Sequence, residues 1–163
     1  MNARSIESVS LAAHPEFRAP HSTGYRIKLL SQLVYRKFSD RLEPFGLTPF
    51  HWVVLCCLWQ EDGLPTSGIG EKLQQVGGTL TGVLDRMAER GLVRRERDPA
   101  DRRICRIWLT ESGKDLEDVL PQIVADLHAE TWAGVSAQAQ AEFSHSLNQA
   151  ISNLNSRSSS VDR

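Results

Sequence analysis

A short stretch in the middle of the sequence combines small side chains with hydrogen-bonding ones. Its candidates for contact with a DNA base or phosphate are Gly78, Thr79, Thr81, Gly82 and Arg86. Threonine can hydrogen-bond a base edge or touch a thymine methyl group, and arginine can bind guanine or a phosphate. The same residues are also typical of an ordinary helix start beside a solvated turn. This stretch alone therefore leaves both interpretations open.

A second group of residues suited to DNA lies in a strongly charged turn further along the chain. Its candidate contacts are Arg97, Asp101, Arg102 and Arg103. An arginine at the tip of such a turn suits the narrow, strongly negative minor groove. Asp98 and Asp101 would repel phosphate unless they pair with these tip arginines and hold the shape of the turn. The alternative is a surface ion-pair cluster that contributes less than about 1 kcal/mol.

The distribution of charge indicates a basic surface that the total charge does not. The chain has 163 residues and a formal net charge of −1. Residues 86–106 hold eight arginines against four acidic residues, a balance of +4. Residues 111–142 hold seven acidic residues against one lysine, a balance of −6. A basic middle beside an acidic later half is typical of a protein that presents one face to phosphate.

The residues that precede both groups of candidate DNA contacts have the periodicity of helices. From about Gly24, apolar residues recur every three or four positions, and the pattern ends near residues 44–46, where proline and glycine oppose helix continuation. Thr48 and Pro49 are typical of a helix start, because threonine can cap free amides and proline fits the first turn. The helix they open runs to about Gln60 and is apolar over most of its surface. We expect this second helix to be buried.

Two short helices joined by a glycine-rich break predict a helix-turn-helix. A turn is expected at residues 61–65, the first helix from residue 66 or 67 to about 73, and the break at residues 76–78. The second helix, over residues 79–90, is the expected reading helix, and Gly91 should stop it. Its inward apolar stripe consists of Leu80, Val83, Leu84 and Met87.

The apolar period then changes from helical to alternating, which predicts a β-hairpin. Its strands are expected over residues 92–97 and 104–109, around a proline-containing turn at 98–103. Arg94, Arg95 and Arg97 alternate along the first strand, so one side of the hairpin is expected to face DNA. The predicted fold class is mainly α with a small β-hairpin wing. It is a winged helix-turn-helix core plus N- and C-terminal dimerisation helices.

The helices outside this core predict a homodimer. Thr110 should cap a helix whose apolar positions run to Leu127, with Pro121 bending it or shifting its start, and Ser136 should begin the last helix. Because a compact winged helix cannot cover three further apolar stripes, we expect a second copy to bury them, with two reading helices about 34–36 Å apart. The alternative is a monomer whose terminal helices pack on their own core.

The predicted domain boundaries follow from these elements. Residues 1–22 form a flexible N-terminal arm, residues 23–46 and 111–155 the helical dimerisation region, residues 47–110 the DNA-binding domain, and residues 156–163 a polar tail.

With these residues assembled, the chain resembles the MarR (multiple-antibiotic-resistance regulator) family of winged helices. The resemblance is strongest in LTPFHWVVL (47–55), LTGVLDRMAERGLVRRERDPADRR (80–103) and IWLTESG (107–113). It implies a triangular homodimer on pseudo-palindromic operators, frequent repression, and DNA release on binding of a small phenolic or anionic molecule or on cysteine oxidation. By match to the motif it implies reading-helix contacts at Thr79, Thr81 and Arg86. It also implies wing contacts at Arg102 and Arg103, supported by Asp101.

The sequence departs from this family at two places. A basic or polar residue is common where Gly82 stands, and a polar cap is common where residues 76–78 read Val-Gly-Gly. Base recognition could therefore depend more on threonines and backbone, with an atypical operator.

The effector cleft that the resemblance implies lies between the dimerisation helices and the winged core. Its candidate residues are Arg26, His51, Cys56 and Trp59, because cationic and aromatic groups near a helical junction suit an aromatic acid. The alternative is that His51 and Trp59 are packing residues.

Three cysteines are an odd number, which favours a reducing compartment over a disulfide framework. Cys56 and Cys57 are adjacent, hence about 100° apart on a helix and poorly placed to chelate one metal together. A switch based on cysteine oxidation would need a lowered thiol pKa, and no basic group adjoins these two in sequence.

Other function classes find little support. The sequence has no glycine-rich phosphate loop after a strand and no paired histidines at metal-ligand spacing, so we predict no enzyme, no cofactor and no metal site. The longest apolar run, residues 52–59, is too short to span a bilayer, and no secretion signal is visible, so we expect a cytoplasmic protein. The remaining alternative is a winged-helix protein-interaction module without specific DNA binding.

Overall fold

The chain begins with two helices whose ends are set by capping residues. The computed structural model describes residues 18–73 and 78–158. The first elements are α1 (Thr23–Leu42), the 3-10 helix η2 (Glu43–Phe45) and α2 (Pro49–Gln60). Ser22 caps α1, because its hydroxyl accepts a hydrogen bond from the Tyr25 amide at 3.3 Å. Gly46, with a φ of +62°, turns the chain between the two helices in a conformation that favours glycine.

Helix α2 starts and ends as predicted, and it is the central element of the core. The Thr48 hydroxyl accepts from the His51 amide at 3.3 Å, and the His51 Nδ1 accepts from the Thr48 amide at 3.1 Å. This reciprocal capping box satisfies two amides that the first turn would otherwise leave free. Val54, Leu55 and Leu58 are fully buried, which confirms the expectation that this helix is buried.

The winged helix-turn-helix follows with one element that sequence reasoning missed. Its elements are β1 (Leu64–Pro65), α3 (Thr66–Lys72), α4 (Gly78–Glu89), β2 (Val93–Arg97) and β3 (Cys105–Leu109). The predicted hairpin is present, but the segment predicted as a turn at 61–65 also contributes β1. The antiparallel sheet has the order β1-β3-β2. Gly91, at φ +69°, ends the α4 region as expected.

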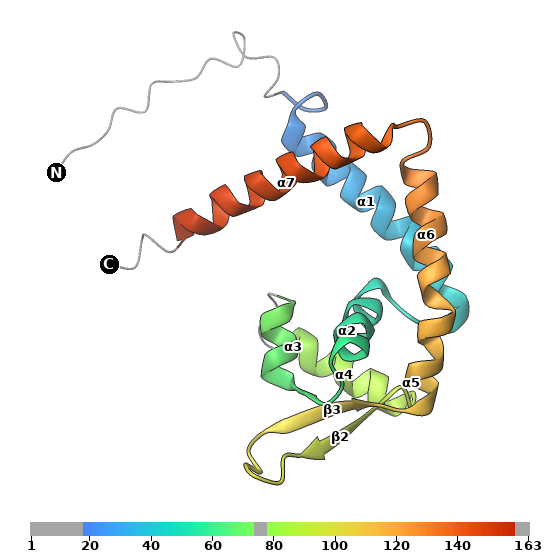
Figure 1. Ribbon diagram of the computed structural model, residues 1–163, viewed down its shortest axis with the longest axis vertical. Helices are drawn as coiled ribbons and strands as arrows, with labels where there is room; N and C mark the ends of the chain where they lie inside the picture. The colour runs from blue at the N-terminus through green and yellow to red at the C-terminus, as the bar shows by residue number, and fades with distance from the viewer. Residues whose placement is uncertain (1–17, 74–77, 159–163) are drawn as a thin grey trace, which may run out of the picture. The chain divides into compact units, whose positions relative to one another are not determined.

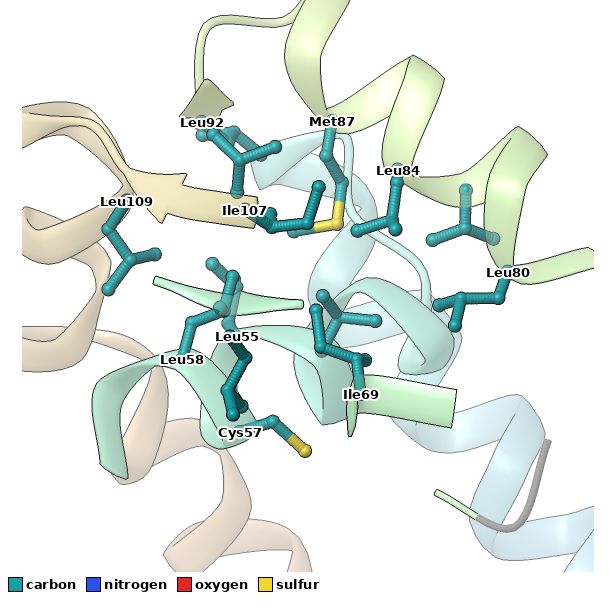
Figure 2. Packing of buried hydrophobic residues seen from close by; sticks show 14 of the residues in the cluster. Leu55, Cys57, Leu58, Ile69, Leu80, Leu84, Met87, Leu92, Ile107 and Leu109 are labelled. Carbon is teal, nitrogen blue, oxygen red and sulfur yellow. The ribbon is translucent and has the colours of Figure 1, made fainter. Parts of the chain in front are cut away.

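The core lies between α2, α3, α4 and the sheet. The predicted inward stripe of α4 is buried, with Leu84 and Met87 0% exposed. Figure 2 shows these two side chains on the same side as Ile107 of β3, with Leu55 and Leu58 of α2 facing them. Because the apolar residues of α4 all reach this core, its polar residues must lie on the outside.

The segment after the wing is divided more finely than predicted. It consists of α5 (Glu111–Asp115), the 3-10 helix η3 (Leu116–Asp118), α6 (Leu120–Thr131) and α7 (Ala137–Ser158). Thr110 caps α5 as predicted, accepting from the Gly113 amide at 3.2 Å. Pro121 stands at the second position of α6, which is the shifted start that its missing amide favours. The expectation of a tail from Ser156 is wrong in part, because α7 continues to Ser158.

The described residues form two compact units, one ending at Val124 and the other beginning at Ala125. Figure 1 follows both by colour, with α1 to α5 in the first and α7 in the second. In the second unit, the Ser136 hydroxyl accepts from the Ala139 amide at 3.2 Å and so caps α7. The rings of Trp132 and Phe143 pack edge-on at 5.4 Å.

Large apolar side chains remain exposed on the terminal helices. On α1, Leu29 and Leu33 are each 42% exposed, and on α7, Ile151 is 48% and Leu154 69% exposed. None of the helices that the structure describes is long and apolar enough to cross a membrane. Exposed apolar stripes of this kind are typical of protein–protein interaction sites.

The capping role of His51 generates a pH prediction. Burial lowers the pKa of His51 below its usual 6.5, and the positive charges of Arg90 and Arg86 lower it further. The unfolded chain therefore takes up a proton near pH 6.5 that the folded chain resists, so folding stability should be lost as pH falls below that value. Glutamine at this position can still accept the Thr48 amide bond.

We expect urea unfolding of the wild type to show decreasing stability between about pH 7 and pH 5, and His51→Gln to show a clearly smaller decrease. Equal losses in the two proteins would contradict the assignment.

Candidate nucleic-acid interface

The outward face of α4 carries the residues that the sequence singled out. Thr79, Thr81 and Arg86 are exposed, on the side of the helix opposite the buried stripe. Gly78 is the first residue of α4, and the break predicted at 76–78 falls largely on residues 74–77, which lie outside the described residues. Thr79, Gly82 and Arg86 are three and four positions apart, so they share one face of the helix.

Gly82 leaves the middle of this face open. A Cβ atom added to Gly82 would have no neighbouring atom within 4 Å, so no packing among the described residues requires glycine here. The Gly82 carbonyl accepts a hydrogen bond from Arg86 Nε at 3.2 Å, which holds the arginine stem beside the opening. A glycine inside a helix destabilises it by about 1 kcal/mol relative to alanine. Because glycine has no side chain, another molecule can approach the backbone closely at this position.

The wing is shaped by the carboxylate of Asp98, which is only 7% exposed. Its Oδ1 accepts from the amides of Ala100 and Asp101 at 2.8 and 3.2 Å. Its Oδ2 accepts from Arg106 Nε, whose guanidinium also donates to the Gly63 carbonyl at 2.9 Å. The hydrogen bond from Arg106 is the main reason why the pKa of Asp98 is lowered. The expectation that Asp98 pairs with a tip arginine is wrong, because its partner is Arg106 of β3.

The tip of the wing holds one arginine in place and leaves another unpaired. Arg103 forms a two-pronged pair with Asp101, at 3.1 Å from Nε to Oδ1 and 2.9 Å from Nη2 to Oδ2. This is the support that was predicted for Asp101, and it lowers the pKa of that carboxyl. Arg97 donates to the Arg102 carbonyl at 3.2 Å. Within the described part of the chain, the exposed Arg102 side chain has no hydrogen bond or ion pair.

Of the four residues predicted to bind an effector, His51, Cys56 and Trp59 lie on α2 and Arg26 lies on α1. His51 is 5% exposed, and its Nδ1 is used in the helix cap. Trp59 Nε1 donates to the Gly113 carbonyl at 3.0 Å, which ties α2 to α5. Arg26 is exposed on α1, and no hydrogen bond or ion pair among the described residues joins it to the other three. A surface hollow of about 460 Å³ includes none of them and is lined by Leu29, Ser31, Gln32, Leu33, Tyr35 and Arg36 of α1.

The adjacent cysteines of α2, Cys56 and Cys57, are poor candidates for an oxidation switch. Burial and, to a smaller extent, the adjacent Cys57 raise the pKa of Cys56 to about 11. Burial also raises the pKa of Cys57. The lowered pKa that sequence analysis required is therefore absent at both thiols, which stay protonated at neutral pH. The described residues contain no group of three or more metal-ligating side chains that could hold a metal ion.

Comparison with known sequences finds one family. A model described as the MarR family matches residues 47–105. The transcriptional regulator SarZ of Staphylococcus epidermidis is 34% identical over 93 residues, which is 57% of this chain and 63% of SarZ. The transcriptional regulator MhqR of Bacillus subtilis is 31% identical over 98 residues, which is 57% of this chain and 68% of MhqR. The match to SarZ thus spans less than two thirds of that protein.

Solved structures with the same fold extend the similarity beyond the winged core. The Staphylococcus aureus MepR–DNA complex has a TM-score of 0.76 and 25% identity, and covers 81% of this chain and 98% of MepR. The Streptomyces coelicolor regulator PcaV, in complex with its natural ligand, has a TM-score of 0.70 and 26% identity, and covers 89% of this chain and 96% of PcaV.

Proposed function

Because this chain belongs to the MarR family, we propose that it is a sequence-specific DNA-binding transcription regulator. In this proposal it acts as a homodimer on pseudo-palindromic operators, represses transcription, and is released by a small-molecule effector. The observation that carries the proposal is the pairing of a small, polar reading-helix face with an arginine-tipped wing that its own residues hold in shape. Both curated relatives are named as transcriptional regulators, in agreement with the prediction that the chain is not an enzyme.

The two parts of the interface suit different grooves. The major groove admits an α-helix, and there Thr79, Thr81 and the open backbone at Gly82 can meet base edges. The unpaired Arg102 suits the narrow minor groove, whose negative potential attracts arginine. The MepR structure, which contains DNA, supports this use of the fold. The cytoplasmic location predicted from the sequence agrees with a chromosomal DNA partner.

The exposed apolar residues of α1 and of α7 support the proposed homodimer. Neither stripe is covered within its own unit, and burying such surface is the usual driving force of association. A second copy of the chain is the partner that would offer the same two stripes. The winged core would then be presented twice, in the two-fold arrangement that a pseudo-palindrome requires.

The proposed effector is a small aromatic or anionic molecule. The ligand-bound PcaV structure supports a ligand site in this fold, while the four residues predicted here remain a proposal. Release by oxidation is the weaker alternative for Cys56 and Cys57, given their raised thiol pKa values. A protein-interaction module would need an apolar reading helix and a neutral wing, which the exposed threonines and arginines do not favour.

The function can be tested by selecting DNA fragments from the source genome with the purified protein at moderate salt. We expect enrichment of a pseudo-palindrome upstream of a small set of genes. Absence of enrichment at low salt as well, with and without reductant, would overturn the regulator and leave the interaction module.

Arg102, the unpaired arginine of the wing, should contribute to DNA affinity by contacting a phosphate or the minor groove. On the selected operator, Arg102→Ala is expected to weaken binding by about tenfold and to flatten the slope of log K against log salt by about one unit. Fluorescence anisotropy over a range of salt concentrations measures both. The control is Arg94→Ala, since Arg94 stacks over Trp108 at 5.6 Å and pairs with Glu96. If both variants lose affinity equally, Arg102 has no special role.

Gly82 should show opposite effects on folding and on DNA binding. Gly82→Ala is expected to raise the stability of the free protein by about 0.5–1 kcal/mol, because alanine favours the helix. The same methyl group should reduce operator affinity, because it occupies the space that DNA approaches. Thermal unfolding and anisotropy measure the two effects.

Gly24→Ala in α1 is the matched control, since its added Cβ also meets no atom within 4 Å. An operator affinity unchanged by Gly82→Ala would rule out close approach at this position.

A further inference from the structure

We propose that Arg95 is a positioning residue for DNA binding. By pairing with Asp85 it joins the wing to the reading helix and neutralises a carboxylate that would otherwise face the DNA. This inference rests on the proposed function. It separates Arg95 from Arg94 and Arg97, with which the sequence pattern groups it.

The contacts of Arg95 join β2 to α4. Its Nη2 lies 2.7 Å from Asp85 Oδ1, and the same nitrogen donates to the Thr81 carbonyl at 3.3 Å. Thr81 and Asp85 are four residues apart, so they lie one above the other on the same face of α4. The Arg95 guanidinium therefore contacts two residues one turn apart on the reading helix, and one of them, Thr81, is a predicted base contact.

The position of Arg95 in the sheet explains why it turns toward the helix. Arg95 is opposite Ile107 in the register of β2 and β3. Directly opposed residues of antiparallel strands share a face of the sheet. Ile107 is fully buried in the core, so Arg95 leaves the sheet on its helix-covered side and is only 31% exposed at the side chain.

Its neighbour Arg94 leaves the sheet on the other side. Arg94 lies over the ring of Trp108 at 5.6 Å and pairs with Glu96, and its side chain is 52% exposed. The alternating arginines of β2 are thus divided by the pleat of the strand. One faces the reading helix and the other does not, although their side chains carry the same charge.

The pairing matters for DNA because of where Asp85 stands. Asp85 is exposed at 54% of its side chain, on the helix that presents Thr81 and Arg86. Without Arg95 its negative charge would face phosphates of the same sign. An exposed ion pair contributes little to folding. The effect of Arg95 should therefore appear in DNA affinity and depend on Asp85.

A double-mutant cycle on the selected operator tests this dependence. The variants are Arg95→Ala, Asp85→Ala and the double variant, with dissociation constants measured by anisotropy and folding checked by thermal unfolding. We expect Arg95→Ala to weaken binding by about tenfold in the wild type but by less than about threefold in the Asp85→Ala background. Arg95→Lys should retain most of the affinity, because a lysine ammonium can still pair with Asp85.

The control is Arg94→Ala, which removes the same charge from the same strand and should change affinity less than twofold. An equal loss from Arg95→Ala in both backgrounds would mean that Arg95 contacts DNA itself, and would overturn the inference. Failure of the wild type to bind any selected sequence would instead overturn the proposed function. Should Arg95→Ala not fold, Arg95→Gln, which also removes the positive charge, gives the same test in the two Asp85 backgrounds: a loss that is equal in both overturns the inference.

Discussion

The wing depends on a single nearly buried carboxylate. Asp98 accepts two backbone amides of the turn and the guanidinium of Arg106, and Arg106 continues to the carbonyl of Gly63 beside β1. A buried charge is stable only when hydrogen bonds and an opposite charge replace its water. The turn, the second strand of the hairpin and the segment before α3 are therefore fixed to one another. Without that network, an arginine at the wing tip would have no defined direction.

The reading helix is held by different forces, and the two parts act as one surface. Helix α4 is fixed from inside by Leu84 and Met87, which are fully buried, so its polar face points away from the core. The guanidinium of Arg95 then joins this helix to the wing strand through Asp85. Apolar packing thus sets where the helix lies, and the pair between Arg95 and Asp85 adds a contact between the helix and the wing. The exposed apolar residues of the terminal helices are where the proposed second copy of the chain would bind.

Local chemistry explains which parts of this account could be predicted from the sequence. The starts of α2 and α7 follow from the hydroxyls of Thr48 and Ser136, and the hairpin follows from its alternating period. These signals lie within a few residues of the structure they specify. The partner of Asp98 could not be predicted in this way, because it lies across the hairpin and competes with nearer arginines. The strand β1 has two residues, too few for any period. The capping role of His51 could not be predicted either, since its residue type alone does not indicate a helix cap.

In the proposed complex, α4 and the wing engage adjacent grooves of one DNA site, and methylation protection with dimethyl sulfate measures this directly. The reagent marks guanine N7 in the major groove and adenine N3 in the minor groove. On the operator recovered from the genome, we expect two patches of N7 protection about one helical turn apart, each flanked by N3 protection. Binding that leaves both atoms reactive throughout the site would contradict it, because the protein would then hold the phosphate backbone without entering either groove.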